Sequence, residues 1–537
     1  MVARDDQAAK DQLLAERRGD EQGRGQADAR DSVGRRSEVN EAAEVSDQQH
    51  DRQGPGELSE GAEPAAAVGA VPQAGDQVGQ AVPDDHRTVV AASVAHRFVP
   101  PHPPRPEKPV ATWRGFFGER ARTSVYGWSQ RAFEIDYLKR DILGFRVHIL
   151  LDPALVQHVL LDNAANYVKP DIVKTLLDPI IGSGLLTSDG GLWREQRRIV
   201  AASFSPAAVE AQRAMFVRAA REAMARWSAG RHDMAAEATR TTMTVIALAL
   251  FGGDARLTSD AAMAHIAAAI EGFSEARMLA LLRLPQFPVT PKGRAGKRGQ
   301  VFLRKTLAEV VDDRWHGRVE PDFLTGVIDA LRQRFADGEA RALAIDNAAT
   351  FYLAGHETTA NAITWASYLL AAQPELQEQL AAEAQAALDG GADDVAERVP
   401  RLRLFLNEAM RLYPPVPRFD RQAVAADRIG EHGLAPGDIV SIWPWMLHRH
   451  RKYWDDPDAF DVERFAGREG RHRFQYLPFG GGPRTCVGAQ FAVAEALTIL
   501  AHWLVAWRFA EAGHDVRVAG MVTLRPKGGL PLILQRR

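Results

Sequence analysis

The sequence predicts a mainly α-helical protein with small β-sheets, in which a single large domain follows a disordered N-terminal tail. Aromatic residues first occur at Phe98 and isoleucine at Ile135, so the residues that can build a core begin near position 98. From there on, apolar residues recur mainly with helical spacing, and no second linker interrupts the pattern. About 440 residues without a visible boundary is unusual for one domain, which indicates a core organised around a large bound group.

The N-terminal segment, residues 1–88, consists mostly of Asp, Glu, Arg, Gln, Gly and Ala with scattered Val. Such a segment cannot bury enough apolar surface to offset the entropy lost on folding, so we expect a disordered tail. It could be a docking arm, a dispensable extension or the result of a start codon placed too far upstream, and the last two are favoured. The folded domain is predicted to span residues 89–537, with the proline-rich residues 100–109 at its entry.

Periodicity defines the expected elements of this domain. Helices are predicted at residues 152–161, 205–229, 234–251, 259–282, 299–315, 342–372, 374–388, 401–412 and 487–507. Short strands are predicted at residues 146–151, 438–443, 522–524 and 532–534. The helix at residues 342–372 is long, and its pattern is amphipathic.

Charge and hydropathy exclude several classes of protein. With 66 Lys and Arg against 69 Asp and Glu, the net charge is −3, which argues against a nucleic-acid binder. The N-terminus lacks the pattern of a signal peptide, and the longest apolar stretches, residues 242–251 and 496–507, are shorter than the roughly 18–20 residues that span a bilayer. We therefore expect a cytoplasmic monomer with no transmembrane anchor. The Ala-, Arg- and Gly-rich composition is typical of a bacterium with a GC-rich genome.

Cys486 is the only cysteine, which excludes an intrachain disulfide framework, a multi-cysteine zinc site and an iron–sulfur cluster. It lies in a glycine-rich loop directly before a predicted helix, where the helix dipole and Arg484 should lower its pKa and favour the thiolate. Gly488 leaves room for a flat group against the backbone. A lone thiolate on such a loop suits an axial haem ligand, whereas the alternative is an inert buried cysteine.

The predicted helix at residues 342–372 contains a second candidate site. Ala354, Gly355 and Thr358 share one face, so two small side chains leave a gap beside a hydroxyl group. Thr358 can donate a hydrogen bond to the carbonyl one turn earlier, and Glu357 is adjacent. The arrangement could hold O₂ and supply protons; a glycine-containing helix with a surface glutamate is the alternative. His356 is expected to be packed or solvated.

Residues 479–488, F-G-G-G-P-R-T-C-V-G, resemble the haem-binding loop of the cytochrome P-450 family, F-x-x-G-x-R-x-C-x-G. Every fixed position is filled, by Phe479, Gly482, Arg484, Cys486 and Gly488. The resemblance implies a P-450-type domain that binds haem b with Cys486 as the iron ligand. It also implies a monooxygenase that reductively cleaves O₂ and inserts one oxygen atom into a C–H or C=C bond, with Glu357 and Thr358 as its acid–alcohol pair and Ala354 and Gly355 beside the haem.

The family resemblance extends to a helix that reads E-x-x-R, with Glu408 and Arg411. By itself this spacing is weak, because it usually marks a solvated ion pair. The proline-rich residues 413–417 and a later aromatic–arginine segment with Arg464 follow in the family's order. The resemblance implies that Glu408, Arg411 and Arg464 form a structural salt-bridge triad. Val462 stands where the family commonly has proline.

Haem propionate ligands follow from the same resemblance. Trp193 and Arg197 match the family's W-x-x-x-R, and both are hydrogen-bond donors on one helix face. Arg421 and Arg484 resemble the other basic positions that bind propionates, and His448 is a weaker candidate. Arg194 and Arg198 are expected to belong to a solvated basic face.

Electrons are expected from a separate ferredoxin or flavodoxin and its NAD(P)H reductase, because only 51 residues follow Cys486. Basic residues shortly before the cysteine loop could receive an acidic carrier; they are Arg449, Arg451, Lys452, Arg468, Arg471 and Arg473. The alternative for these residues is a solvated basic loop that binds no carrier. For the whole protein, the alternatives are a peroxide-driven peroxygenase or a non-catalytic haem sensor. The complete Glu357–Thr358 motif argues against both of the latter.

The substrate is expected to be a lipophilic small molecule, because the pocket residues implied by the resemblance are mainly apolar. The resemblance implies that the pocket is lined by the loop at residues 167–186, the region 270–289, the first half of the helix at 342–372, residues 416–419 and the turn at 522–524. The candidate residues are Leu279, Leu281, Leu282, Leu284, Phe287, Phe351, Val416, Phe419 and Val522.

Overall fold

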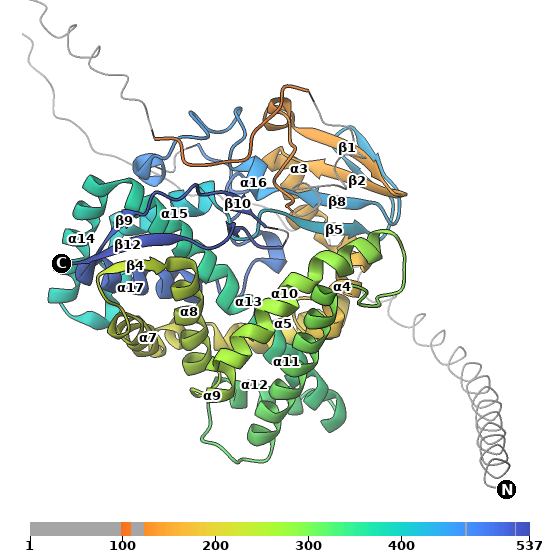
Figure 1. Cartoon of the computed structure of the whole chain (residues 1–537). Helices are drawn as coiled ribbons and strands as arrows, with labels where there is room; N and C mark the ends of the chain where they lie inside the picture. Colours follow the sequence, from red (N-terminus) through yellow and green to blue (C-terminus); the bar gives the residue numbers. More distant parts are fainter. Residues whose placement is uncertain (1–97, 109–122, 468–469, 521) are drawn as a thin grey trace, which may run out of the picture. The chain divides into compact units, whose positions relative to one another are not determined.

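The computed structural model describes residues 98–108, 123–467, 470–520 and 522–537 (Figure 1). The predicted tail, residues 1–88, lies outside the described residues. Over the part that is described, the chain is mainly helical with small sheets, as the periodicity predicts.

Long helices form most of the domain. Their bounds are α4 Asp171–Ile181, α5 Gly190–Ser203, α7 Arg213–Ala225, α8 Met234–Leu250, α10 Asp260–Leu281, α11 Pro291–Trp315, α12 Phe323–Arg332, α13 Asp337–Ala372, α14 Pro374–Asp389, α15 Pro400–Leu412 and α17 Ala489–Ala506. Shorter helices are α3 Pro153–Gln157, α6 Pro206–Ala211, α9 Ala255–Thr258 and α16 Pro444–Leu447. Single turns are η2 Gln130–Phe133, η3 His158–Asp162, η4 Ala164–Asn166, η5 Ala392–Glu397, η6 Val462–Phe465 and η7 Gly482–Arg484.

Four small sheets accompany these helices. The largest has the order β1-β2-β8-β5-β3, with strands Tyr137–Ile142, Phe145–Leu150, Ile439–Ile442, Phe419–Ala423 and Tyr167–Val168. Within it β2 and β8 are parallel, and the other neighbours are antiparallel. A three-stranded sheet joins β4 Gly230–Asp233, β12 Pro531–Arg536 and β9 Trp507–Glu511. Two-stranded ladders pair β6 Asp427–Ile429 with β7 His432–Leu434, and β10 Val518–Ala519 with β11 Arg525–Pro526.

Helix α13 is the central element of the core. It packs against α8, α11, α12 and α15, and side chains on nearly every face of it are buried. The predicted amphipathic pattern is therefore wrong for this helix, because neighbours cover it all round. Its burial fixes the position of residues 354–359, which lie in its middle.

Helix α17 follows the cysteine loop and packs against α7 and α14. Among the residues that the structure describes, it is the one helix long and apolar enough to cross a membrane by length and composition alone. Because 61% of it is buried inside the protein, it is accounted for as a helix of the core.

A strap at residues 98–108 lies across the region that contains the E-x-x-R helix. Arg105 makes two hydrogen bonds to the carboxylate of Asp458, at 2.6 and 2.5 Å. The hydroxyl of Tyr413 donates to the carbonyl of Pro101 at 2.8 Å, and the N–H of Phe460 donates to the carbonyl of Phe98 at 2.9 Å. The strap is thus held by residues more than 300 positions later in the chain.

Candidate active site

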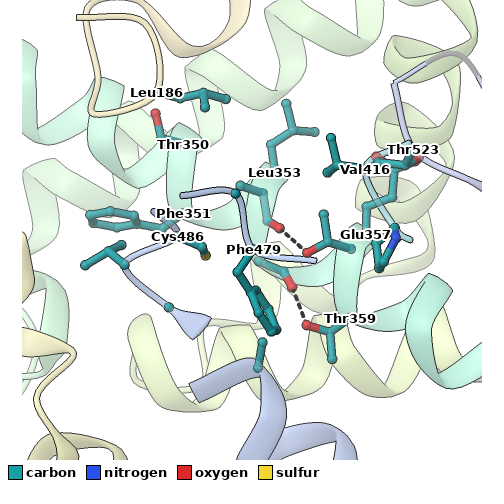
Figure 2. Close-up of a pocket in the computed structure, with 18 of the residues that line it drawn as sticks. Leu186, Thr350, Phe351, Leu353, Glu357, Thr359, Val416, Phe479, Cys486 and Thr523 are labelled. Atoms are coloured by element: carbon teal, nitrogen blue, oxygen red, sulfur yellow. Dashed lines mark hydrogen bonds between the residues drawn. The ribbon is translucent and has the colours of Figure 1, made fainter. Parts of the chain in front are cut away.

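A large cavity of about 410 Å³ lies between the middle of α13 and the cysteine loop (Figure 2). Ala354 and Cys486 are both exposed, although they belong to the interior of the domain, because they border this cavity. Its wall is largely apolar; apolar lining residues include Leu177, Ile181, Leu185, Leu186, Ile246, Leu250, Ile270, Phe351, Leu353, Val416, Phe419 and Val522. The volume and lining are those of a ligand site.

The cysteine loop is closed by backbone hydrogen bonds. The N–H of Cys486 donates to the carbonyl of Phe479 at 2.9 Å. Gly482 has a φ of +68°, and a Cβ there would lie 1.7 Å from the carbonyl oxygen of Leu160, so only glycine fits. At Gly488 the nearest atom to an added Cβ is 3.6 Å away in the ring of Phe204, so no contact within the protein requires glycine there. Gly488 lines the cavity, which agrees with a flat ligand against its backbone.

Although Cys486 is open to the cavity, the surrounding protein atoms desolvate its thiol and raise its pKa, while the N–H of Gly488 and the charge of Arg197 act in the opposite direction. The expected lowering of this pKa by the helix N-terminus is therefore wrong for the protein alone: desolvation outweighs the two favourable interactions. A thiolate at this position needs a further positive partner, and a metal ion facing the thiol would be one.

Across the cavity, α13 contributes the predicted gap. The hydroxyl of Thr358 donates to the carbonyl of Ala354 at 2.9 Å, as the sequence predicts. Thr359 makes the same kind of bond to Gly355 at 3.3 Å. A Cβ on Gly355 would meet Ile246 of α8 at 2.6 Å, so the helices approach closely here. Ala354, Gly355 and Thr358 all line the cavity.

Glu357 also lines the cavity, and its carboxylate has a partner that sequence reasoning missed. The hydroxyl of Thr523, in the bend between β10 and β11, donates to it at 2.6 Å. His356 is buried on the other side of the helix, where its ring nitrogen bonds the carbonyl of Tyr352 at 2.6 Å. Of the two outcomes expected for His356, packed or solvated, the structure shows the packed one.

One edge of the cavity carries a cluster of cationic and donor side chains. Trp193 and Arg197 lie one turn apart on α5, and Arg421 projects from β5 on the same face as Phe419. Arg484 forms an ion pair with Asp189, and its guanidinium lies 4.2 Å from the centre of the Trp193 ring. All four predicted donors line the cavity.

Lys169 joins this cluster; it lies in the loop at residues 167–186 that the resemblance places at the pocket, but no motif assigns it a role. Burial lowers its pKa well below the usual value, and the charges of Arg421 and Arg484 lower it further. Burial likewise lowers the pKa of Arg421 to about 10, with Arg484 as the next cause. Crowded, desolvated cations of this kind favour an anionic ligand, and two carboxylates would satisfy them.

Gln196, between Trp193 and Arg197 in the sequence, anchors α5 to α13. Its amide donates to the carbonyl of Ser183 at 3.0 Å and accepts from the amide of Asn347 at 2.6 Å. These buried bonds fix the rotation of α5, so Trp193 and Arg197 face the cavity. Arg194 and Arg198 are exposed, as predicted.

His448 is not part of the site, and its expected role as a weaker propionate ligand is wrong. It is fully buried away from the cavity, where its Nε2 accepts a hydrogen bond from the N–H of Leu477 at 2.8 Å. Its carbonyl accepts from Arg411 at 2.8 Å.

The three residues of the predicted triad lie together behind the cysteine loop. Arg411 meets Glu408 through two bonds of 2.7 Å, and both side chains are completely buried. Arg464 donates to the same carboxylate at 3.1 Å. The remaining N–H groups of Arg411 reach the carbonyls of His448, Pro457 and Ala459. None of the triad lines the cavity.

Most of the basic residues expected at the electron-carrier surface have other partners. Arg449 is buried, and its Nε lies 3.5 Å from the carboxylate of Asp458. Arg451 pairs with Glu134 and Lys452 with Asp136. Arg471 is half-buried and packs on Trp454 and Phe465.

Arg473 is exposed, as are Arg451 and Lys452, but those two take part in the ion pairs just described; Arg468 lies outside the described residues. Arg473 lines a small hollow with Gly480, Gly481 and Thr485 of the cysteine loop. Of the expected basic surface, Arg473 is thus the described cation that borders the cysteine loop, whereas the exposed Arg451 and Lys452 are neutralised by Glu134 and Asp136.

The expected pocket residues divide into two groups. Phe351, Val416, Phe419 and Val522 line the cavity. Leu279 and Leu281 do not, and Leu282, Leu284 and Phe287 are exposed in the segment between α10 and α11. Ile270 of α10, the first residue of the expected region 270–289, does line the cavity.

The cavity thus presents a thiol on one wall, small side chains on the opposite wall and cations along one edge. These features fit a flat metal macrocycle with two carboxylates, as in haem. Among the described residues, no group of three or more His, Cys, Asp or Glu side chains could hold a metal ion without such a macrocycle.

Comparison with known proteins agrees with this geometry. The cytochrome P-450 family model matches residues 140–529. The chain is 33% identical over 375 residues to cyclooctatin synthase of Streptomyces melanosporofaciens, covering 67% of this chain and 80% of that protein. It is 27% identical to Protein LUTEIN DEFICIENT 5, chloroplastic, of Arabidopsis thaliana, over 72% of this chain and 70% of that one. It is 28% identical to taurochenodeoxycholic 6 alpha-hydroxylase of Sus scrofa, over 73% and 83% of the two chains.

Proposed function

Because this chain belongs to the cytochrome P-450 family and is a haem-dependent monooxygenase, we propose that Cys486 is its iron ligand and that Glu357 and Thr358 deliver protons for the reaction. The observation that supports the proposal most strongly is the juxtaposition across one cavity. The lone thiol of the described chain faces the small residues Ala354 and Gly355 and the hydroxyl of Thr358. Haem supplies the binding and reductive cleavage of O₂ when it is bound.

The protein's own residues would bind and orient this group. Trp193, Arg197 and Arg484 are donors suited to one propionate edge, with Arg421 and Lys169 adding positive charge. The ion pair between Arg484 and Asp189 holds the guanidinium in place before the ligand binds. Arg197 would have two roles: it would donate to a propionate, and its charge acts to lower the pKa of the Cys486 thiol.

Proton delivery is assigned to the carboxylate of Glu357 and the hydroxyl of Thr358. The hydroxyl of Thr358 is satisfied by the carbonyl of Ala354, so its own proton points along the helix in this structure. A hydroxyl oxygen also has two lone pairs that can accept hydrogen bonds. Thr358 can therefore accept a hydrogen bond from a donor in the cavity while it keeps its own bond to the carbonyl of Ala354. Glu357 lies at the same cavity wall and can exchange protons with water.

We propose a lipophilic organic substrate, hydroxylated or epoxidised at a C–H or C=C bond. The apolar wall formed by residues such as Leu186, Phe351 and Val416 supports this class, because it offers few polar partners to a polar ligand. The names of two relatives refer to cyclooctatin and to a taurochenodeoxycholic compound; these names describe those proteins.

We further propose a bacterial, cytoplasmic monomer that receives electrons from a separate ferredoxin or flavodoxin served by an NAD(P)H reductase. The Streptomyces relative supports the bacterial type, and the exposed Arg473 beside the cysteine loop supports an acidic carrier. Gel filtration and fractionation of the source cells test the oligomeric state and the compartment.

A substrate screen by haem difference spectroscopy tests the proposed function. Lipophilic compounds should shift the Soret band on binding, and the best of them should be converted with NADPH and surrogate redox partners. Faster conversion with hydrogen peroxide alone than with NADPH would favour a peroxygenase. Binding without any conversion under either condition would favour a haem sensor.

A further inference from the structure

The carboxylate of Glu357 is held by a residue from a distant part of the chain. The hydroxyl of Thr523 donates to its Oε1 at 2.6 Å, across a sequence separation of 166 residues. This is a short hydrogen bond between a hydroxyl and a carboxyl group. Both residues line the cavity, and Figure 2 shows them at the same wall, beside Val416.

Helix α13 cannot itself fix this carboxylate. Neighbouring residues on a helix point about 100° apart and do not face each other, so the helix does not direct Glu357 toward Thr358. A glutamate side chain also has several rotatable bonds, whose freedom must be restricted if the carboxylate is to stay in one place. The restriction has to come from a partner outside the helix.

The bend that carries Thr523 is suited to that task because it is anchored on both sides. The N–H of Leu524 donates to the carbonyl of Pro415 at 2.9 Å. The carbonyl of Leu524 accepts a hydrogen bond from the indole N–H of Trp365 at 3.1 Å. On the other side, the carbonyl of Gly520 accepts from the N–H of Ser124 at 3.0 Å. Thr523 itself is 7% exposed.

We propose that Thr523 is a positioning residue that holds the Glu357 carboxylate at the cavity wall for proton delivery. The inference rests on the proposed role of Glu357 and adds the residue that holds its carboxylate in one orientation. Thr523 transfers no proton to the substrate; its hydroxyl bond selects one orientation of the carboxylate. The bend between β10 and β11 thereby sets the position of a carboxylate on α13.

Four variants and one control test the proposal. Thr523→Val removes the hydroxyl at nearly constant volume, and Thr523→Ser keeps it. Glu357→Gln is made alone and, as the fourth variant, together with Thr523→Val. Thr364→Val is the control, because it also removes a buried threonine hydroxyl, here from α13, the helix that carries Glu357. This hydroxyl donates to the carbonyl of Ala360 at 2.7 Å, and Thr364 does not line the cavity. Each variant is measured for haem content, product per NADPH and, by crystallography, the orientation of residue 357.

We expect Thr523→Val to keep its haem but lower product per NADPH by about tenfold, because the carboxylate is no longer held in place. Its crystal structure should show Glu357 in a different or divided orientation. Thr523→Ser and Thr364→Val should behave like the wild type. In the Glu357→Gln background, Thr523→Val should have little further effect, since the two changes disturb one interaction.

Three results would overturn the inference: an unmoved Glu357 in Thr523→Val, full coupling in that variant, or a loss of haem in it that Thr364→Val does not share. The single variant Glu357→Gln separates this inference from the proposed function. If Glu357→Gln turns over like the wild type, the role of Glu357 itself is wrong. If it is slow while Thr523→Val is normal, only the positioning role is wrong.

Discussion

Arg411 and Glu408 form a completely buried ion pair in which two parallel N–H groups of the guanidinium meet two carboxylate oxygens, both at 2.7 Å. The backbone carbonyls of His448, Pro457 and Ala459 use the remaining donors of Arg411. The pair therefore joins α15 to the segment that precedes the cysteine loop, without touching the cavity.

Removing one partner of this pair should destabilise the whole domain. In Glu408→Ala the charge of Arg411 is left buried without its counter-ion, which costs about 3–5 kcal/mol. We expect a large fall in the denaturation midpoint and in haem retention. The exposed pair of Glu195 and Arg198 has the same i, i+3 spacing and is the matched control. A Glu408→Ala protein as stable as Glu195→Ala would contradict the structural role of the triad.

The assignment of Cys486 predicts a spectroscopic loss without unfolding. The reduced, CO-bound protein should show the red-shifted Soret band typical of thiolate-ligated haem, and Cys486→Ser should lack it. The apoprotein of the variant should melt near the wild-type temperature, since serine differs from cysteine in one atom. An unchanged band in Cys486→Ser would end the assignment.

Thr358 offers a test of proton delivery by three substitutions. Thr358→Ala and Thr358→Val lose the hydroxyl and should lower product per NADPH by roughly tenfold or more while releasing hydrogen peroxide. Thr358→Ser should stay coupled. Haem content and substrate binding should persist in all three, because helix α13 is held by packing along its length. Wild-type coupling in Thr358→Val would show that Thr358 only shapes the helix.

Asp427 predicts a pH dependence of stability. Burial alone would raise its pKa, but hydrogen bonds from Tyr167, His158, the N–H of Arg428 and Asn163 outweigh burial and lower it to about 2. A carboxyl with a lowered folded-state pKa stabilises the protein above its unfolded-state pKa, and this contribution is lost as the pH falls toward the folded-state value.

Asp427→Asn should accordingly lower the free energy of unfolding at neutral pH by on the order of 1–2 kcal/mol, allowing for solvent screening. The difference from the wild type should shrink as the pH falls below about 4. Urea denaturation at several pH values measures it, with the exposed Asp141→Asn on β1 as the control. A difference that grows on acidification would have the wrong sign.

Substitution of Arg473 tests whether an acidic electron carrier binds beside the cysteine loop. Arg473→Glu should slow reduction by an acidic ferredoxin or flavodoxin, most clearly at low salt, where surface charges are least screened. Arg428→Glu, an exposed arginine on β6, controls for the change in net charge. Equal reduction rates in the two variants would refute a carrier site at Arg473.

The local motifs of the site could be predicted from the sequence because each one fits in a single loop or helix turn. The bonds from Thr358 to Ala354 and from Arg411 to Glu408 span four and three residues. Helix α12 was missed although it has such a local pattern: a capping box of Asp322 and Thr325 precedes apolar residues at helical spacing.

Other site residues could not be found in this way. The resemblance places the segments of Lys169 and Thr523 at the pocket, but no spacing in the sequence links these two residues to α13 or assigns them a role, because their partners are set by the tertiary fold. The raised pKa of Cys486 is likewise a result of packing, since the local loop alone predicts the opposite direction. The strand predicted at residues 522–524 from the apolar pattern is wrong, whereas the turn implied there by the resemblance is confirmed: the segment is a bend, and the N–H of Leu524 bonds Pro415 rather than a neighbouring strand.

The strap at residues 98–108 has a consequence for synthesis of the chain. Pro101 and Arg105 contact Tyr413 and Asp458, which are 312 and 353 residues further on. At about 5–20 residues per second, a ribosome needs roughly 15–70 s to produce those partners after the strap has emerged. During that interval the strap has nothing to bind, so this part of the domain can close only after most of the chain has been translated.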